Sequence, residues 1–537
     1  MTSLKRSCFP RGRAAAALLL TALLGGCDNS LLETPKTIIV ADNLYTDAAG
    51  FDAGLNALYF QVRRERHGTN NDVNDLMATA WTSGVDNAYG LYLSPTERIF
   101  NEWGVRNNPQ DGFINHIWGW LYQTINAANT IVDRAENPSV RWTPEEKTRV
   151  VAEARLIRAW SYRHLTYLFG PVPLNLAEST GENIRTDWER APLDSVRKVM
   201  EADLLFAEQN LPALSPNPGK VTRAVAQHYL AELYLAMGEP ARAEAKAQAV
   251  IGSGLYRLIT QRYGVRASQP GIAFMDQFVD GNANRNQGNT EALWVLQYAA
   301  NVQGGGASIM RRTWVTRYDA NRGLMITAEY GGRGIGRLAI TRFGLQLYEA
   351  QDQRGGPFAV RRFYLYNNPA NLPAGRKLGD TLFTVVGPER VSNPLWPSTR
   401  KWDYADPNDI TGAAQFGDQV YLRLAETYLL LAEAQFKQGK LAQAAEAINV
   451  VRRRAGASEI TPAQVTLAFI LDERSRELVT EEHRRYTLLR TGTWLDRTKR
   501  FNPLSGPPIV ARDTLLPIPQ SVIDANLSRP LPQNPGF

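Results

Sequence analysis

Apolar side chains recur every three or four residues along most of the chain, the spacing of one face of an α-helix. Residues 51–66 and 113–135 are two such stretches. A third starts at Thr143, where a threonine N-cap is followed by a proline and two glutamates. It ends at Gly170, which is followed by two prolines within three residues. The pattern predicts a mostly α-helical fold.

The most specific internal pattern is a unit that occurs twice. In residues 231–243 and 432–444, an alanine is followed by a glycine seven residues later and by another alanine five residues after that. Small residues at these positions let two antiparallel helices approach closely, with the glycine in the turn between them. This is the spacing of a tetratricopeptide (TPR) helix pair, whose stacked copies share a core. Two unrelated amphipathic hairpins are the alternative.

A long stretch of different character separates the two copies. Residues 256–419 are rich in Gly, Asn and Pro, with a strand-like run at 290–298. We expect an N-terminal helical part with TPR-like repeats (43–255), an irregular loop-rich region (256–419), and a C-terminal part with TPR-like helices and a proline-rich tail (420–537). The predicted fold is a mostly α, TPR-like helix-pair scaffold with a large irregular loop region. Loops mounted on a rigid scaffold commonly carry function.

Residues 1–26 are typical of a lipoprotein signal peptide. A basic leader precedes an apolar run at 14–24, which is too short to span a bilayer. The ending Leu24, Gly25, Gly26, Cys27 resembles a bacterial lipoprotein box, in which the cysteine is acylated. We therefore predict lipidation at Cys27 and a lipid-anchored tether at 27–42, so that the protein faces outward from a membrane. A cleaved signal with an accidental cysteine is the alternative.

Composition excludes several classes of protein. Cys8 and Cys27 are the two cysteines, so the mature body has no thiol for disulfides, metal sites or nucleophilic catalysis. The leader supplies four of the net seven positive charges, and no Lys/Arg tract is interleaved with aromatics, so we expect no nucleic-acid binding. The five histidines show no metal-ligand spacing. We expect no metal and no cofactor.

Four segments in a characteristic order carry a family resemblance. They are the box ending at Cys27, the helix and aromatic-glycine turn at 152–174, the charged segment at 472–492, and the C-terminal segment at 516–537. Together they resemble the SusD/RagB family of outer-membrane nutrient-uptake lipoproteins. The resemblance implies a SusD-like, TPR-containing protein that is lipid-anchored at the cell surface. It also implies a SusC-like TonB-dependent transporter as partner, capture of an oligosaccharide or peptide ligand, and no catalysis.

The charged segment at 472–492 allows two interpretations. Its glutamates and arginines lie three or four residues apart, a spacing that stabilises an exposed helix through ion pairs. A catalytic carboxylate pair is the alternative, although nothing in the sequence shows one of these acids desolvated, as general acid chemistry requires. We expect a structural ion-pair face.

Two loop clusters combine aromatic and polar side chains. Sugar rings pack their apolar faces on aromatic rings, while amides, carboxylates and guanidinium groups bind the hydroxyls. The clusters predict a ligand platform on one face of the scaffold, although burial in the core is the alternative for each aromatic ring. The candidate ligand-binding residues are Trp81, Asp86, Asn87 and Tyr89 in the first cluster and Trp314, Arg317 and Tyr318 in the second.

Two other functions compete with ligand capture for transport. An exported glycoside hydrolase on a helical scaffold requires two facing carboxylates about 5–10 Å apart in a cleft. A TPR scaffold that binds a protein or peptide requires a groove along the helical repeats. The leading hypothesis is an outer-membrane surface lipoprotein that binds an oligosaccharide, or another nutrient oligomer, and delivers it to the transporter.

Overall fold

The computed structural model describes residues 41–69, 72–92, 94–406 and 408–537. The signal peptide, Cys27 and nearly all of the tether therefore lie outside the described residues. Among the described residues, no helix combines the length and the apolar character needed to cross a bilayer.

The structure is mostly helical, as predicted, with long helices at both ends of the chain and short elements between them. The helices are α2 (Ala41–Leu44), α3 (Ala48–Arg63), α4 (Thr79–Thr82), α5 (Pro95–Asn101), α6 (Trp103–Arg106), α7 (Gly112–Arg134), α8 (Pro144–Phe169), α9 (Leu193–Asn210), α10 (Arg223–Met237), α11 (Pro240–Gly252), α12 (Ala273–Asp276), α13 (Met310–Trp314), α14 (Arg342–Gln346), α15 (Leu424–Lys437), α16 (Leu441–Ala455), α17 (Leu467–Leu478), α18 (Arg484–Arg490), α19 (Trp494–Phe501) and α20 (Gln520–Ala525).

The helix start predicted at Thr143 is confirmed. The Thr143 side chain accepts a hydrogen bond from the Glu146 amide at 3.2 Å, and the Glu146 side chain accepts one from the Thr143 amide at 2.7 Å. This reciprocal pair satisfies two backbone donors that an uncapped helix leaves unpaired. At the other end, α8 stops at Gly170, whose φ of +73° is left-handed.

The duplicated unit forms two antiparallel helix pairs, α10 with α11 and α15 with α16. Gly238 and Gly439 occupy the turns at φ of +78° and +72°, a backbone conformation that glycine adopts without strain. The alanines of the repeated pattern are fully buried, which lets the helices approach closely. Helix α11 packs on α15, so the two pairs stack directly although the irregular segment separates them in sequence. The TPR-like scaffold is therefore confirmed.

Within the described part of the chain, the strands form five separate two-stranded antiparallel ribbons. They are β1 (Gly68–Thr69) with β2 (Asp72–Leu76), β3 (Ala88–Gly90) with β5 (Leu338–Ile340), β4 (Ala292–Leu296) with β10 (Gln419–Arg423), β6 (Val360–Arg361) with β9 (Ser398–Thr399), and β7 (Phe363–Leu365) with β8 (Thr381–Phe383). Strand β4 falls within the predicted strand-like run.

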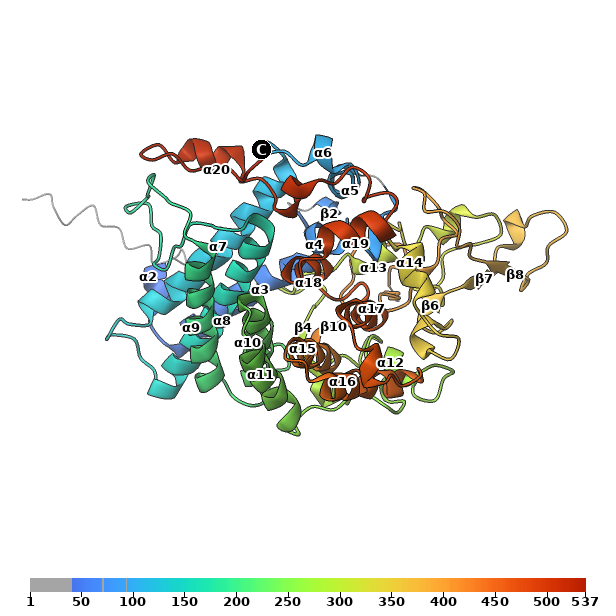
Figure 1. Ribbon diagram of the computed structural model, residues 1–537, viewed down its shortest axis with the longest axis horizontal. Coiled ribbons are helices and arrows are strands. Elements are labelled where there is room, and N and C mark those ends of the chain that lie inside the picture. Colours follow the sequence, from blue (N-terminus) through green and yellow to red (C-terminus); the bar gives the residue numbers. More distant parts are fainter. Residues whose placement is uncertain (1–40, 70–71, 93, 407) are drawn as a thin grey trace, which may run out of the picture.

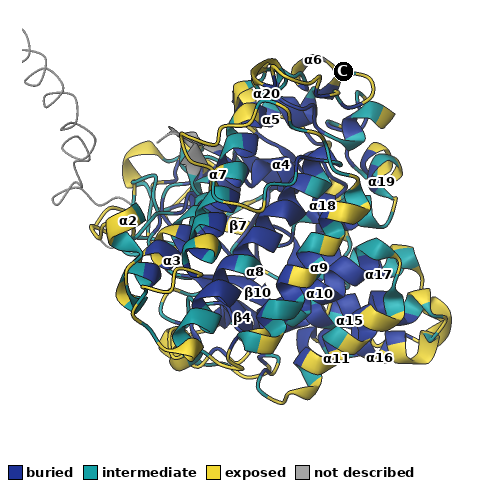
Figure 2. Ribbon diagram, turned by 90° about the vertical axis from the view of Figure 1, so that its left-hand side faces the viewer, coloured by how far each residue is buried: buried dark blue, intermediate teal, exposed yellow. Residues whose placement is uncertain are grey.

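The irregular segment lies to one side of the helical scaffold. In Figure 1 the helices α7 to α11 form the left half, whereas β6, β7 and β8 extend to the right. Strands β4 and β10 are buried along their whole length and connect this segment to the scaffold. Figure 2 shows these strands in dark blue at the centre, while α11 and α16 at the edge carry exposed residues.

Candidate functional site

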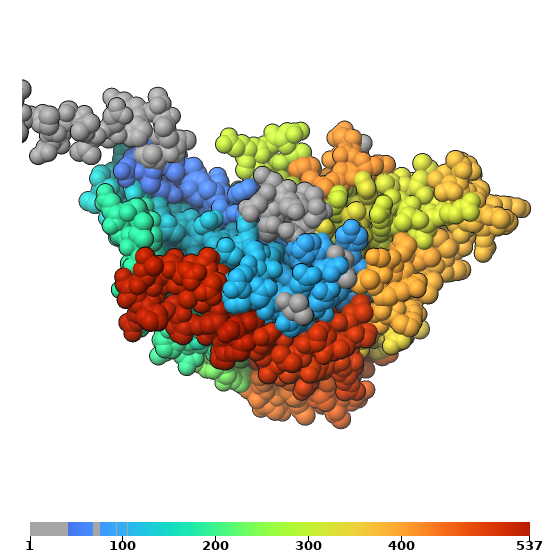
Figure 3. Space-filling view, turned by 90° about the horizontal axis from the view of Figure 1, so that it is seen from above, coloured from blue at the N-terminus to red at the C-terminus, as the bar shows by residue number. Residues whose placement is uncertain are grey.

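The two predicted loop clusters meet in the structure. Strand β3, which contains Tyr89 of the first cluster, pairs with β5, downstream of the second cluster, in the register Ala88 to Ile340 and Gly90 to Leu338. Just beyond β3, the amides of Leu91 and Tyr92 donate to the Arg337 carbonyl at 2.7 and 3.1 Å. Viewed from above, the light-blue segment that contains β3 borders the yellow and orange irregular segment (Figure 3).

A cavity of about 190 Å³ opens to solvent where these segments meet. We call it the Tyr92 cavity. Ligand pockets for small molecules typically enclose about 300–1,000 Å³, so this cavity holds only part of an oligomer. It is lined by Leu91, Tyr92, Arg317, Ala320, Ile335, Gly336, Ser392, Asn393 and Pro394.

Backbone geometry shapes two walls of the cavity. Gly336 has a φ of +66°, and a Cβ atom at this position would lie 3.0 Å from the Thr316 Cα and 3.2 Å from a Leu91 methyl carbon. Glycine is therefore required by both conformation and space. Ser392 adopts a φ of +58°, and its amide donates to the Leu91 carbonyl at 2.7 Å. A non-glycine residue in this conformation is strained, and such strain concentrates at functional sites.

Of the seven candidate residues, Arg317 alone lines the Tyr92 cavity, and it is exposed. The sequence interpretation missed Tyr92, whose side chain is 44% exposed. Tyr92 lies at the end of the first loop cluster, and this position could have marked it as a candidate ligand-binding residue. Ser392 and Asn393 carried no signal, because they reach the cavity through a loop that is distant in sequence.

The expectation that Trp81 stacks on a sugar is wrong in this conformation, because the ring is fully buried. Its centroid lies 4.8 Å from that of His164 and 5.5 Å from that of His483. Trp81 lies in α4, whose four residues are all buried. It therefore belongs to the hydrophobic core and reaches no solvent.

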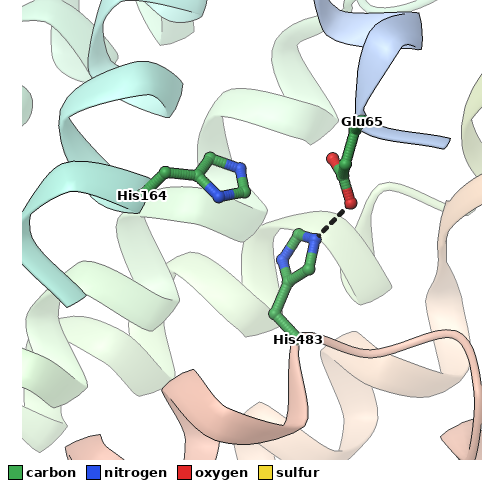
Figure 4. Close-up of side chains that lie close together, drawn as sticks. All are labelled: Glu65, His164 and His483. Carbon is green, nitrogen blue, oxygen red and sulfur yellow. Dashed lines mark hydrogen bonds and ion pairs between the residues drawn. The ribbon is translucent and has the colours of Figure 1, made fainter. Parts of the chain in front are cut away.

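The two histidines beside Trp81 form a buried cluster with Glu65 (Figure 4). Their potential ligand atoms lie within 4.8 Å of one another, close enough to surround a metal ion. However, the Arg163 Nη1 lies 2.8 Å from the His483 Nδ1, and arginine can only donate. The His483 proton is thus on Nε2, which donates to Glu65 at 2.8 Å. A metal ion would have to displace this proton, so the hydrogen bonds fit a metal poorly.

Asp86 and Asn87 hold the first loop to the C-terminal helices. Asp86 is fully buried and accepts two hydrogen bonds from Arg484, at 2.8 and 2.7 Å, and one from Arg497, at 2.7 Å. Burial alone would raise the pKa of Asp86, but the two guanidinium groups outweigh it and hold that pKa below its ordinary value. The Asn87 Nδ2 donates to the Ser475 hydroxyl at 2.9 Å. Neither polar group faces the cavity, contrary to expectation.

The other three aromatic candidates are also buried, so the predicted solvent-facing platform is not formed by them. Tyr89 packs edge-on against Trp396, with 6.0 Å between ring centroids. Tyr318 stacks on Tyr364 at 5.1 Å, and its hydroxyl donates to the Gly332 carbonyl at 2.9 Å. Trp314 is 2% exposed. These rings pack in the protein interior beneath the loops and do not reach the solvent.

The charged segment at 472–492 forms ion pairs as predicted, but the expectation that it is exposed is wrong. Glu477 is fully buried and contacts Arg354, Arg423 and Arg454. Burial alone would raise its pKa, but the three guanidinium groups hold that pKa well below its ordinary value. A carboxylate held ionised in this way cannot act as a general acid near neutral pH. The other buried charged residues of the segment are Glu473, Arg474, Glu482, Arg484 and Arg485.

A second cavity lies between α8, α9 and α10, where a TPR scaffold would bind a peptide. Its volume is about 30 Å³, enough for one or two water molecules. Trp160, Tyr167 and Tyr229 line it, and the ion pair between Arg163 and Glu232 closes one wall, with 2.9 Å between Nη2 and Oε2. This cavity is too small to hold a large side chain of a peptide.

Comparisons with known proteins agree with this fold. A model of the SusD family matches residues 385–537, and a model described as "Starch-binding associating with outer membrane" matches residues 53–235. SusD-like protein P2 of Formosa agariphila is 25% identical over 97% of this chain and 98% of its own length. The starch-binding protein SusD of Bacteroides thetaiotaomicron is 26% identical over 78% of each chain.

Solved structures share the same architecture. A laminarin-binding SusD-like protein superposes with a TM-score of 0.71 at 22% identity, covering 92% of this chain and all of that chain. The surface glycan-binding protein A of Bacteroides fluxus gives a TM-score of 0.70 at 17% identity, covering 91% of this chain and 99% of that chain. These superpositions show a shared fold, and the two family matches, together with the relatives that span nearly the whole sequence, support a SusD-like family protein.

Proposed function

We propose that this chain is an outer-membrane surface lipoprotein that binds an oligosaccharide, or another nutrient oligomer, at the Tyr92 cavity. Cys27 would carry the lipid anchor, and a SusC-like TonB-dependent transporter would receive the ligand. The observation that carries the proposal is the cavity itself, which combines an exposed tyrosine ring with polar side chains where two loop regions meet.

The named relatives support a glycan as the ligand. One relative is named a starch-binding protein, and two structural neighbours are named a laminarin-binding and a surface glycan-binding protein. The apolar face of a pyranose ring packs on an exposed aromatic ring such as Tyr92. Because the cavity is small and open, the ligand would place one or two sugar residues inside it and the rest across the surface.

The first test replaces Tyr92 with alanine. Screening laminarin, starch and acidic polysaccharides by affinity electrophoresis gives the probe that binds best, and isothermal titration calorimetry then measures its affinity. We expect Tyr92→Ala to weaken binding by about 1–3 kcal/mol, as for an anchoring aromatic ring. The melting temperature should change little, because the ring is half exposed.

Phe383→Ala is the matched control for this test. Phe383 is an exposed aromatic residue that does not line the cavity, so its removal should leave affinity unchanged. Binding by Tyr92→Ala that equals wild type would overturn the site. Equal losses from both variants would point to a different surface.

Delivery to a transporter is tested by purification. The full-length protein extracted in a mild detergent should co-purify with a TonB-dependent β-barrel. A protein that remains strictly monomeric in its native membrane, with no transporter encoded nearby, would contradict this part of the proposal.

The absence of catalysis is tested by long incubation with the best-bound glycan. We expect the glycan to stay intact, because arginines hold the pKa values of the buried Glu473 and Glu477 below their ordinary value and so keep both ionised. New reducing ends that disappear when one carboxylate is removed would favour the glycoside hydrolase instead.

A further inference from the structure

The Tyr92 cavity carries a net positive charge. Arg317 is the one charged side chain among its lining residues, and no ion pair of its guanidinium is seen within the described part of the chain. A second arginine, Arg337, lies beneath Tyr92 at 6.0 Å from the ring centroid, but Glu97 neutralises it at 2.9 Å. The charge of Arg317 therefore remains available to pair with a ligand.

The polar groups of the cavity are mainly hydrogen-bond donors. Arginine offers five N–H donors and no acceptor. The Asn393 Oδ1 already accepts from the Leu395 amide at 3.1 Å, which leaves the donors of its Nδ2 for a ligand. Ser392 and Tyr92 add hydroxyl groups, and none of the described residues that line the cavity is a carboxylate. Sugar hydroxyls both donate and accept, so a site of donors leaves the O–H donors of a neutral sugar without partners, whereas carboxylate and sulfate oxygens only accept.

We propose that the Tyr92 cavity selects anionic oligosaccharides, whose carboxylate or sulfate group pairs with Arg317. This inference rests on the proposed function, since it names the ligand class of the same site. The planar guanidinium matches the two oxygens of either group in a bidentate pair. Apolar walls formed by Leu91, Ile335 and Pro394 weaken solvent screening and so strengthen the attraction.

Paired probes test the charge preference directly. Oligogalacturonate and its methyl ester share a backbone with and without carboxylates, and sulfated laminarin and laminarin do the same for sulfate. We expect wild type to bind at least one anionic probe about tenfold more tightly than its neutral partner, a difference of about 1.4 kcal/mol. The preference should weaken as the ionic strength rises to about 1 M, where the Debye length falls to about 3 Å. The two pairs distinguish a carboxylate ligand from a sulfate ligand.

Three variants assign the preference to one side chain. Arg317→Gln should reduce anionic binding to the level of the neutral partner, and Arg317→Lys should keep part of the preference because the charge remains. Arg322→Gln is the matched control: Arg322 is exposed, but it donates to Asn371 and Leu372 away from the cavity. It should bind like wild type.

Three results would overturn the inference. They are neutral probes that bind as tightly as anionic ones, no binding of either anionic probe, and a preference that survives in Arg317→Gln. The Tyr92→Ala variant distinguishes failure of the charge selection from failure of the proposed function. If Tyr92→Ala loses neutral binding while anionic probes gain no advantage, the glycan site stands and only the charge selection fails. If Tyr92→Ala binds every probe like wild type, the site itself is wrong.

Discussion

Replacing Trp81 with alanine should cost stability and leave ligand binding unchanged. The indole ring is fully buried against His164, His483 and Tyr486. Its Nε1 has no hydrogen-bond partner within the described residues, so the loss comes from packing and from the cavity left behind. Removal of a buried tryptophan costs about 3–5 kcal/mol. This is a large share of a typical folding free energy of about 5–15 kcal/mol.

The choice of assay follows from the size of the chain. An unfolding entropy of about 2.1 cal/mol/K per residue gives roughly 1 kcal/mol/K for about 500 residues that unfold together. A loss of 4 kcal/mol then lowers the melting temperature by only about 4 °C, so we choose guanidinium titration, which gives the change in unfolding free energy itself. Trp81→Phe is the control and should lose less. A Trp81→Ala variant with unchanged stability and abolished glycan binding would refute the burial argument and return Trp81 to the ligand site.

Three further predictions concern charge, pH and anchoring. Glu477→Gln should destabilise the fold by about 3–5 kcal/mol in denaturant titration, since it leaves buried guanidinium groups unpaired; wild-type stability would contradict this. Burial holds the pKa of His164 well below its ordinary value, so on acidification the unfolded chain binds a proton at this site before the folded chain does. The free energy of unfolding therefore falls as the pH drops below about 6.5, by up to about 1.4 kcal/mol per pH unit. His164→Gln should reduce that slope between pH 6.5 and 5, and an unchanged slope would exclude His164 as its source. Cys27→Ser should release the protein from membranes or leave it unprocessed, and retention in the outer-membrane fraction with full function would refute the lipid anchor.

The helical scaffold could be predicted because its signals are local. Periodicity placed helices at 51–66 and 113–135, and the structure has them at Ala48–Arg63 and Gly112–Arg134. The helix start at Thr143 and the helix end at Gly170 depend only on residues a few positions away, so both can be predicted from the local sequence. The repeated alanine and glycine spacing likewise specifies a helix pair without reference to the rest of the chain.

The binding face could not be predicted in the same way, because exposure depends on contacts distant in sequence. Trp81 and Tyr92 lie in one aromatic-polar segment and look equivalent in sequence. Trp81 is covered by α8 and by the C-terminal segment, whereas Tyr92 is turned outward by hydrogen bonding to Arg337, which is 245 residues away. Turn-rich composition marked the correct region but gave no information on which ring faces solvent.

The charged segment shows the same limit. Glutamate and arginine three or four residues apart predict a solvent-exposed helix face, because these residues usually lie at the surface. Here the arginine partners include residues 354, 423 and 454, which three other segments bring to Glu477. Burial of charge is permitted only where partners of opposite sign converge, and such convergence is a property of the fold.

These buried ion pairs explain how an irregular segment can present a fixed site. Asp86 binds Arg484 and Arg497 of the C-terminal helices just before β3, and Arg337 binds Glu97 just before β5. Both strands of the ribbon beneath the Tyr92 cavity are thus held by desolvated charge pairs, whose separation would leave an uncompensated charge in the core. A loop fixed in this way loses little conformational entropy when a ligand binds. Asp86 and Asn87, which sequence reasoning assigned to the ligand, instead hold in place the loop that carries Tyr92.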